Sequence, residues 1–171
     1  IGQIYKTQGN LDRALAYFQK SLLIKEELGN KNGMAVEYNN IGLIYVKQGR
    51  FQDAMNEYNK SLKIFEELGN IKGIANIYMH IGINKKNQNN YDDALVYYRK
   101  SLALCEKIGN DKLKSRILGN IGTLYSMKGD YQKAISSHNK SLKLALDLNA
   151  LKIIEYNRRH LYTIYKETNQ V

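Results

Sequence analysis

Apolar and polar positions follow each other along this chain with the period of an α-helix. One segment shows the helical spacing i, i+3, i+4 and i+7 in its apolar residues, namely Tyr38, Ile41, Gly42 and Tyr45. Gly49 follows this segment and Gly69 follows the next one, and Gly readily adopts the left-handed conformation that ends a helix. Asn89 and Asn149 stand at equivalent positions elsewhere, and Asn tolerates that conformation next best. The pattern predicts helices joined by loops so short that neighbours run antiparallel.

The pattern repeats at an interval of about forty residues, which indicates a stacked array of small helical units. The decapeptide SLLIKEELGN at 21–30 returns as SLKIFEELGN at 61–70, SLALCEKIGN at 101–110 and SLKLALDLNA at 141–150. We therefore expect helix pairs at 1–28, 31–68, 71–108 and 111–148, and a helix at 151–168. As domains, this is a single array over 1–171, with a truncated repeat at 1–30, full repeats at 31–70, 71–110 and 111–150, and a terminal helix or truncated repeat at 151–171. Each pair buries its apolar face against the next.

A glycine in the middle of a helix needs a physical reason, because it costs about 1 kcal/mol relative to Ala. Gly42 and its counterparts precede an alanine column that includes Ala54 and a serine column that includes Ser61. We expect Gly42 to let its helix press closely against Ala54 and Ser61 of the following helix. Three aromatic residues would fill the space around the crossing, namely Tyr38, Tyr45 and Tyr58.

These columns resemble the tetratricopeptide repeat. Its aromatic, Leu-Gly, Tyr, Ala and aromatic signature corresponds here to Tyr38, Ile41-Gly42, Tyr45, Ala54 and Tyr58. The resemblance covers essentially the whole chain, although Lys85, Leu118, Arg158 and Tyr162 depart from the signature. The forty-residue variant, with Leu-Gly-Asn in place of the usual terminal Pro, is similar to Leu-Gly-Asn spindle-orientation adaptors, kinesin light chain and bacterial peptide-sensing regulators. The resemblance implies an all-α fold of antiparallel helix pairs, stacked as a right-handed superhelix or α-solenoid.

The same resemblance implies a non-catalytic interaction module that binds a peptide in its concave groove, as the sensor or scaffold part of a larger signalling protein. Helical spacing turns one set of residues away from the partner helix and into that groove: Val36, Asn39, Asn40, Leu43, Lys47, Asn76, Met79, His80, Ile83, Lys86, Arg116, Asn120, Thr123, Arg159 and His160. An amide can donate and accept a hydrogen bond at once, which suits contact with peptide backbone. The apolar members could equally pack between successive first helices.

The partner predicted from these features is a protein or peptide, or a segment of the same polypeptide. Basic groove residues favour an acidic ligand. The chain has 26 Lys and Arg against 16 Asp and Glu, for a net charge of +10, and the excess is concentrated in residues 81–160. A basic half is compatible with nucleic-acid binding, but AT-rich codon usage explains it as well, so nucleic acid ranks third. Self-association through apolar helix faces at the two ends is the alternative function.

Other classes of function have little support in the sequence. No apolar run approaches the ~20 residues of a membrane helix, and no signal peptide is recognisable. His80, His138 and His160 lack the closely spaced Cys, Asp or Glu partners of a metal site, and His138 falls in the aromatic packing column. The single Cys105 lies among apolar neighbours. We therefore expect no enzyme activity, no cofactor, no metal and no small-molecule substrate. A cytoplasmic location is favoured, and the start at Ile1 within a repeat suggests a piece of a longer protein.

Overall fold

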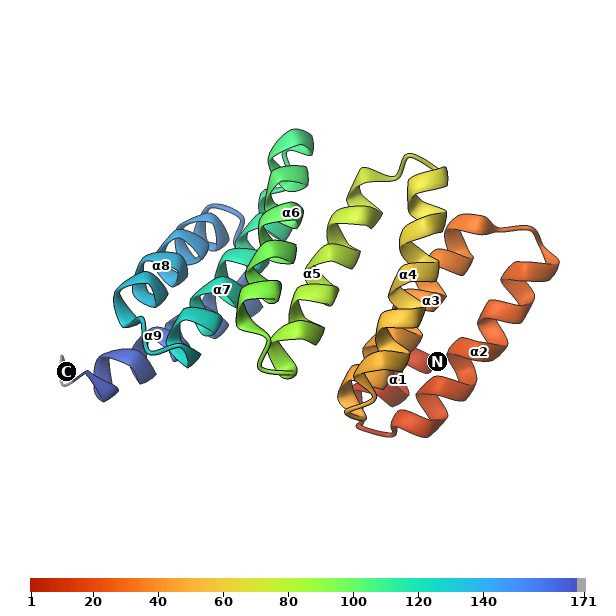
Figure 1. Cartoon of the computed structure of the whole chain (residues 1–171), viewed down its shortest axis with the longest axis horizontal. Coiled ribbons are helices and arrows are strands. Elements are labelled where there is room, and N and C mark those ends of the chain that lie inside the picture. The colour runs from red at the N-terminus through yellow and green to blue at the C-terminus, as the bar shows by residue number, and fades with distance from the viewer. Residues whose placement is uncertain (169–171) are drawn as a thin grey trace. The chain divides into compact units, whose positions relative to one another are not determined.

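The computed structural model describes residues 1–168, and every regular element within that range is an α-helix. The helices, in chain order in Figure 1, are α1 (Gly2–Thr7), α2 (Leu11–Glu27), α3 (Lys31–Lys47), α4 (Phe51–Glu67), α5 (Ile71–Asn87), α6 (Tyr91–Ile108), α7 (Asp111–Met127), α8 (Tyr131–Asp147) and α9 (Leu151–Glu167). The α-solenoid class of antiparallel helix pairs predicted from the repeat is confirmed. The predicted single array over 1–171 stays a prediction, and its last three residues lie outside the described chain.

The helices end at the Gly and Asn residues that the sequence analysis identified as helix stops. The backbone is left-handed at Gly49 and Gly69, and also at Asn89 and Asn149, where φ is 61° and 50°. After Gly69, Asn70 accepts a hydrogen bond from the backbone N–H of Gly73 and so caps the start of α5. The Leu-Gly-Asn sequence therefore combines a helix stop and a helix start in adjacent residues, which explains how a chain without Pro turns so sharply.

The chain divides into two compact units, residues 1–84 and residues 85–171, with the boundary inside α5. In the first unit α1 packs on α2, α2 on α3 and α3 on α4. In the second unit α6 packs on α7, α7 on α8 and α8 on α9. Each unit is described by itself below.

The mid-helix glycines make room for an aromatic ring. Tyr58 fills the space beside Gly42 as predicted, and its ring, not Ala54 or Ser61, supplies the nearest atoms. A Cβ placed on Gly42 would lie 2.5 Å from the ring of Tyr58 on α4. Gly122 has the same relation to the ring of His138, at 2.6 Å. Close approach is therefore real, but a large flat side chain fills the space that the missing Cβ leaves.

The small residues of the second helices have a different task. The Ser61 hydroxyl donates to the backbone carbonyl of Ala35 at 2.7 Å, and the hydroxyl of Ser141 donates to the carbonyl of Ser115 at 2.6 Å. Each bond joins the second helix of a pair to the first, and all four residues are fully buried. The recurring serine is thus an interhelical hydrogen-bond donor within a tightly packed pair.

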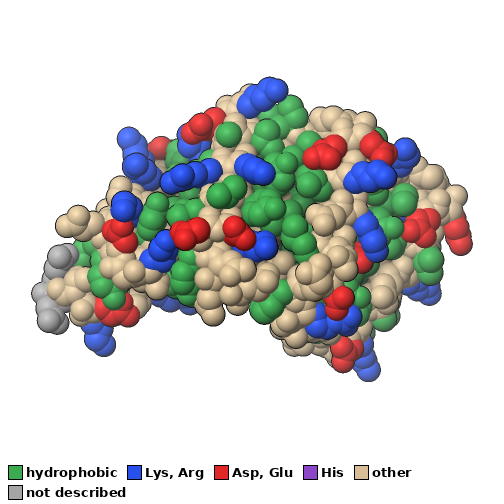
Figure 2. Space-filling model, in the orientation of Figure 1, with side chains coloured by type: hydrophobic (Ala, Val, Ile, Leu, Met, Phe, Trp, Pro, Cys, Tyr) green, Lys and Arg blue, Asp and Glu red, His purple; other side chains and the backbone are tan. Residues whose placement is uncertain are grey.

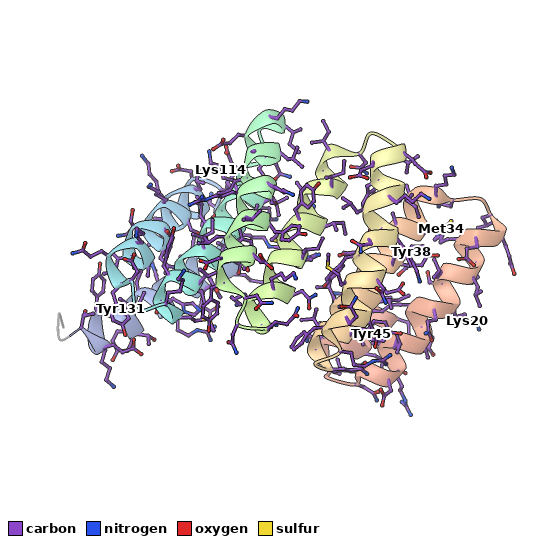
Figure 3. The ribbon with its side chains drawn as sticks, in the orientation of Figure 1. Lys20, Met34, Tyr38, Tyr45, Lys114 and Tyr131 are labelled. Atoms are coloured by element: carbon purple, nitrogen blue, oxygen red, sulfur yellow. The ribbon has the colours of Figure 1, made fainter. Side chains whose placement is uncertain are left out.

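Tyr38 and Tyr45, labelled in Figure 3, lie on α3 and contact both neighbouring helices in part through polar groups. The Tyr38 hydroxyl donates to Glu26 of α2 at 3.3 Å, and the ammonium of Lys60 on α4 lies 5.3 Å from the centre of its ring. Tyr45 packs against the buried cluster that contains Phe18. Both tyrosines therefore line the packed side of α3, which leaves the other side free for contacts outside the pair.

Candidate functional site

The first helices of the pairs carry a partly exposed side that does not face their own second helix. We call this side the open face and define it by residues: Val36, Asn39, Asn40, Leu43, Lys47, Asn76 and Ile83 in the first unit, and Lys86, Arg116, Asn120, Thr123, Tyr156, Arg159 and His160 in the second. On α3 the contrast is clear, because Ile41 and Ile44 are 3% and 0% exposed whereas Val36 is 42% exposed. Every one of these open-face side chains retains surface that a ligand could reach.

Two predicted groove residues do not belong to that surface. Met79 is 0% exposed and His80 is 8% exposed, so both are part of the interior. Helical spacing placed them on the outward side of α5, but spacing alone cannot report which neighbours cover a side chain. Because the oxygen of the Asn39 amide can only accept, Nδ1 of His80 donates to it, at 2.7 Å. His80 therefore acts as a support for Asn39 and is removed from the set of ligand contacts.

The first unit has a cleft of about 360 Å³ on its open face. It is lined by Asn32, Val36, Asn39, Phe65, Asn70, Lys72, Gly73, Asn76 and Ile77. Four of these are amides, and Val36, Phe65 and Ile77 supply the apolar part of the wall. The sequence analysis identified Val36, Asn39 and Asn76 but missed Asn32 and Asn70.

The amides of this cleft are held in place by bonds that leave capacity for a ligand. The Asn70 side-chain N–H donates to the Asn32 oxygen at 3.1 Å, and the Asn76 N–H donates to the backbone carbonyl of Lys72 at 2.9 Å. An amide group has two N–H donors and two acceptor lone pairs, so each side chain can make further bonds. Such a wall is suited to a ligand with alternating donors and acceptors, such as an extended peptide backbone.

Asn40, the amide predicted to contact ligand backbone, is bonded within the protein. Its side-chain N–H donates to Glu37 at 3.1 Å, and Glu37 also accepts a hydrogen bond from Ser21 at 2.8 Å. Asn40 is half-buried and keeps its amide oxygen available. Its equivalent Asn120 on α7 is also half-buried. The role of these two amides in binding stays a prediction.

In the second unit, an aromatic residue of α9 covers part of the open face of α7. A Cβ on Gly119 would lie 3.2 Å from the ring of Tyr156, so the missing side chain admits that ring. The Tyr156 hydroxyl is 2.6 Å from the Thr123 hydroxyl, which itself donates to the carbonyl of Gly119 at 3.2 Å. Burial raises the pKa of Tyr156, which keeps the phenol protonated and able to donate. Gly119 was a signal in the sequence that the periodicity did not explain.

A buried polar network lies beneath this surface. His138 and Asn157 are both fully buried, and Nδ1 of His138 donates to the Asn157 oxygen at 2.9 Å. Asn157 donates in turn to the Ser141 hydroxyl at 2.8 Å. The packing role predicted for His138 is confirmed by its burial, and desolvation lowers its pKa. The ring of His138 stacks on that of His160, with centres 5.2 Å apart and planes 7° from parallel.

Several basic side chains lie on the open face. Burial lowers the pKa of Lys86 and also that of Arg116. Neither forms an ion pair with any residue of the described part of the chain, and Arg159 forms none there either. In the first unit, burial and the nearby charge of Lys47 lower the pKa of Lys6. Each unit therefore carries basic open-face side chains that form no ion pair with the residues described: Lys47, with Lys6 beside it, in the first, and Lys86, Arg116 and Arg159 in the second.

Residues 1–168 show no arrangement suited to metal binding or to thiol chemistry. No group of three or more His, Cys, Asp or Glu within that range is placed to hold a metal ion. Cys105 is buried, and burial raises the pKa of its thiol, which disfavours the reactive thiolate. No helix in the described range is long and apolar enough to cross a membrane.

Comparison with known proteins gives a family match and a structural match. A family model described as tetratricopeptide repeat matches residues 1–67 and 73–147. No curated protein matches the chain at a significant level. Among solved structures, BtubC (BKLC) from P. vanneervenii is 23% identical, with a TM-score of 0.72 over 86% of this chain and 61% of its own.

Two further structures resemble the chain over nearly its whole length. A Signal Transduction ATPase with Numerous Domains protein with a tetratricopeptide repeat sensor, from Pyrococcus horikoshii, is 20% identical with a TM-score of 0.80, over 98% of this chain and 26% of its own. A Rap protein complexed with Competence and Sporulation Factor is 15% identical with a TM-score of 0.85, over 99% of this chain and 51% of its own. The chain thus spans at most 61% of these three proteins, and the likeness at such identities establishes the fold.

Proposed function

Because the chain belongs to the tetratricopeptide repeat family, we propose that it is a non-catalytic module that binds an extended peptide segment on its open face. The observation that carries this proposal is the amide-lined cleft of the first unit. Four Asn side chains surround a partly apolar wall there, which matches the alternating polar and apolar character of an extended peptide. A similar fold is found in a Rap protein complexed with another factor and in a repeat described as a sensor, which supports an interaction role.

Apolar contacts would supply most of the affinity for the peptide, and the amides would fix its register. Val36 is 42% exposed, and covering it together with the exposed part of Leu43 would remove apolar surface from water, at about 25 cal/mol per Å². The amides would add little net energy, because each bond to ligand replaces a bond to water, at about 0.5–1.5 kcal/mol apiece. Their contribution is to fix the position of the peptide, since a shifted backbone would leave amides unsatisfied.

The experiment is a selection from a random peptide library with the purified chain, followed by affinity measurements on variants. Asn32→Ala combined with Asn76→Ala should weaken a selected peptide about tenfold or more, because two bonds of about 1 kcal/mol are lost. Asn59→Ala is the matched control, because Asn59 is an exposed residue of α4 outside the cleft. If the double variant binds the selected peptide as tightly as the Asn59 variant does, the cleft is not the binding site.

Self-association is a second candidate, favoured by exposed apolar side chains on the first and last helices. Ile1 and Ile4 are 74% and 59% exposed, and Leu151 and Tyr162 are 76% and 61% exposed. Exposed apolar patches often mark interfaces. Sedimentation velocity over a dilution series distinguishes the candidates, because a dimer formed by these residues should dissociate on dilution and be weakened by Leu151→Ser. A sedimentation coefficient that stays monomeric at the highest concentration would eliminate this candidate.

A further inference from the structure

Two imidazole rings of the second unit lie face to face where α9 packs on α8. The rings of His138 on α8 and His160 on α9 have centres 5.2 Å apart, and their planes are 7° from parallel. His138 is 0% exposed, and a Cβ on Gly122 of α7 would lie 2.6 Å from its ring. The His138 ring is therefore enclosed between α7 and α9, and the part of the enclosure that α9 supplies contains a second titratable ring.

The two nitrogens of the His138 ring are placed to suit its neutral form. Nδ1 donates to the Asn157 oxygen at 2.9 Å, and the Asn157 amide is held in this orientation because its N–H donates to the carbonyl of Ile153 at 2.8 Å. Nε2 is buried and has no hydrogen-bond partner among residues 1–168. Protonation would place an N–H without an acceptor there, together with a positive charge that is removed from water.

The groups that surround the two rings do not compensate such a charge. They are neutral or positively charged: Tyr156, Asn157 and Arg159 of α9, Gly122 and Thr123 of α7, and Lys86 of α5. Burial lowers the pKa of His138, and the hydrogen bond to Asn157 opposes this effect. Burial is also the main cause of the lowered pKa of His160, followed by the charges of His138, Arg159 and Lys86. Both rings are therefore neutral near pH 7.

Helix α9 is held to the second unit by few buried side chains. Three of its seventeen residues are buried, and only Leu161 and Ile164 among them are apolar. The neighbouring pair is more firmly joined, because the hydroxyls of Ser115 on α7 and Ser141 on α8 each donate to the other residue's backbone carbonyl, at 2.7 and 2.6 Å. Local opening begins in elements with few buried apolar contacts. We therefore expect α9 to separate from α8 more readily than α8 separates from α7.

We propose that His138 and His160 form a pH-sensitive switch, which holds α9 on α8 while both rings are neutral and releases α9 when they take up protons. Release exposes both rings to water and separates their positive charges. It also removes from the second unit the open-face side chains that α9 carries, namely Tyr156, Arg159 and His160. The inference does not rest on the proposed peptide binding, because it concerns the stability of a contact between two helices.

Proton linkage sets the direction and the size of the effect. When α9 opens, both imidazoles return from lowered pKa values to the ordinary value of about 6.5. Below that pH the open form holds more protons than the closed form, so the open population increases as the pH falls toward the lowered values. Between about pH 7.5 and pH 5.5 the increase is at most about hundredfold for two protons and about tenfold for one. Asp and Glu, whose ordinary pKa is about 4, change little in charge over this interval.

The test is hydrogen exchange of backbone amides, followed by NMR on the chain between about pH 7.5 and pH 5.5. Rates are expressed as protection factors, which correct for the intrinsic effect of pH on amide exchange. We expect the protection of α9 amides to fall by about tenfold to hundredfold over this interval, and to stay below that of α7 amides at every pH. The ring-proton shifts of His138 and His160 should change over the same pH interval in which α9 loses protection.

The repeat itself supplies conservative variants. Earlier repeats have Tyr at the position of His138 and Asn at the position of His160, namely Tyr58 and Tyr98, and Asn40 and Asn120. His138→Tyr combined with His160→Asn should therefore preserve the packing and remove the pH dependence of α9 protection. Either change alone should leave at most about a tenfold decrease, since one proton remains. The matched control is His80→Asn, which removes the remaining His of the chain from the first unit and should leave the response of α9 unchanged.

The proposal is overturned if the protection of α9 is the same at pH 7.5 and pH 5.5, or if α9 and α7 have equal protection factors throughout. It is also overturned if the folded double variant responds to pH as the unmodified protein does. Circular dichroism checks the folding of each variant. If the double variant does not fold, the unmodified protein decides: His138 and His160 that titrate while α9 stays protected would contradict the switch, and titration that coincides with the loss of protection would support it.

Discussion

Replacing Gly42 by Ala should destabilise the protein, although Ala is the better helix former. The added methyl would lie 2.5, 2.8 and 3.1 Å from three ring carbons of Tyr58. Carbon atoms in contact prefer about 3.5–4.0 Å, so the ring or the helix must move by about 1 Å. Tyr58 is 0% exposed, so the ring has no free volume into which it can move.

Two opposing effects set the change in stability caused by Gly42→Ala. Ala gains about 1 kcal/mol over Gly within a helix, whereas overpacking a filled core costs about 1–3 kcal/mol and sometimes more. Because the clash involves a fully buried ring rather than a flexible chain end, we expect the upper part of the overpacking range and a net loss of about 1–2 kcal/mol. For a chain of this size, each kcal/mol lowers the melting temperature by about 2–4 °C.

The assay is urea unfolding followed by circular dichroism, with a matched glycine and a double variant. Gly33 lies on the same helix, but its added Cβ would meet the side chain of Lys25 at 2.9 Å and that of Asn30 at 3.0 Å. The Lys chain can move aside, and the Asn30 side chain, which accepts a hydrogen bond from the Gly33 N–H at 2.8 Å, has to shift only slightly, so Gly33→Ala should cost less than Gly42→Ala. In a Tyr58→Ala background the ring is absent, and Gly42→Ala should then become stabilising by up to about 1 kcal/mol. Equal effects of Gly33→Ala and Gly42→Ala, or no change of sign without the ring, would refute this explanation of the recurring glycine.

Three further predictions concern buried polar groups. The hydroxyl of Tyr58 is buried with no hydrogen-bond partner among the described residues. Tyr58→Phe should therefore leave the free energy of urea unfolding unchanged or raise it by about 1 kcal/mol. A decrease of about 1 kcal/mol would mean that the hydroxyl is bonded. Burial lowers the folded-state pKa of His138, so its contribution to stability is complete above its unfolded pKa of about 6.5 and is lost as pH falls from there toward the folded value. The urea concentration at the unfolding midpoint should therefore decrease as the pH is lowered from about 7.5 to about 5.5, and the decrease should be smaller for His138→Phe. Equal decreases would show that His138 is not the group responsible. Asn157→Ala removes the bond that Asn157 accepts from His138 and the bond that it donates to Ser141, and should cost about 1–3 kcal/mol. Asn139→Ala, at an exposed position of α8, should cost little; equal costs would show that the network does not stabilise the unit.

The positions of the helices could be predicted from the sequence because they depend on local chemistry. Gly and Asn at the chain turns fix the backbone there, as the left-handed φ of Asn89 shows, and the apolar spacing on α3 identifies its packed side through Ile41. These features involve residues within a turn or two of one another. A repeat also presents the same signal several times, so an exception such as Asn149 is easily recognised.

What the sequence could not predict depends on which residues, far apart in the chain, come into contact in the folded protein. The sequence placed Tyr58 at the crossing together with Tyr38, Tyr45, Ala54 and Ser61, but it could not show which of them lies nearest Gly42, because that depends on the rotation of two helices about their axes. Likewise, Met79 has an outward position by spacing and is nevertheless 0% exposed. The cleft escaped notice for the same reason, since Asn32 and Asn70 are far apart in the chain and meet only in the folded unit.

Peptide binding on the open face is tested most directly by mapping amide chemical shifts of the isotopically labelled chain as a library-selected peptide is added. We predict that the largest shifts cluster on the side-chain and backbone amides of Asn32, Asn39 and Asn76, which line the cleft of the first unit. Shifts concentrated instead on the second helices, for example around Asn59 of α4, or on the exposed apolar residues of α1 and α9, would contradict peptide binding at this surface.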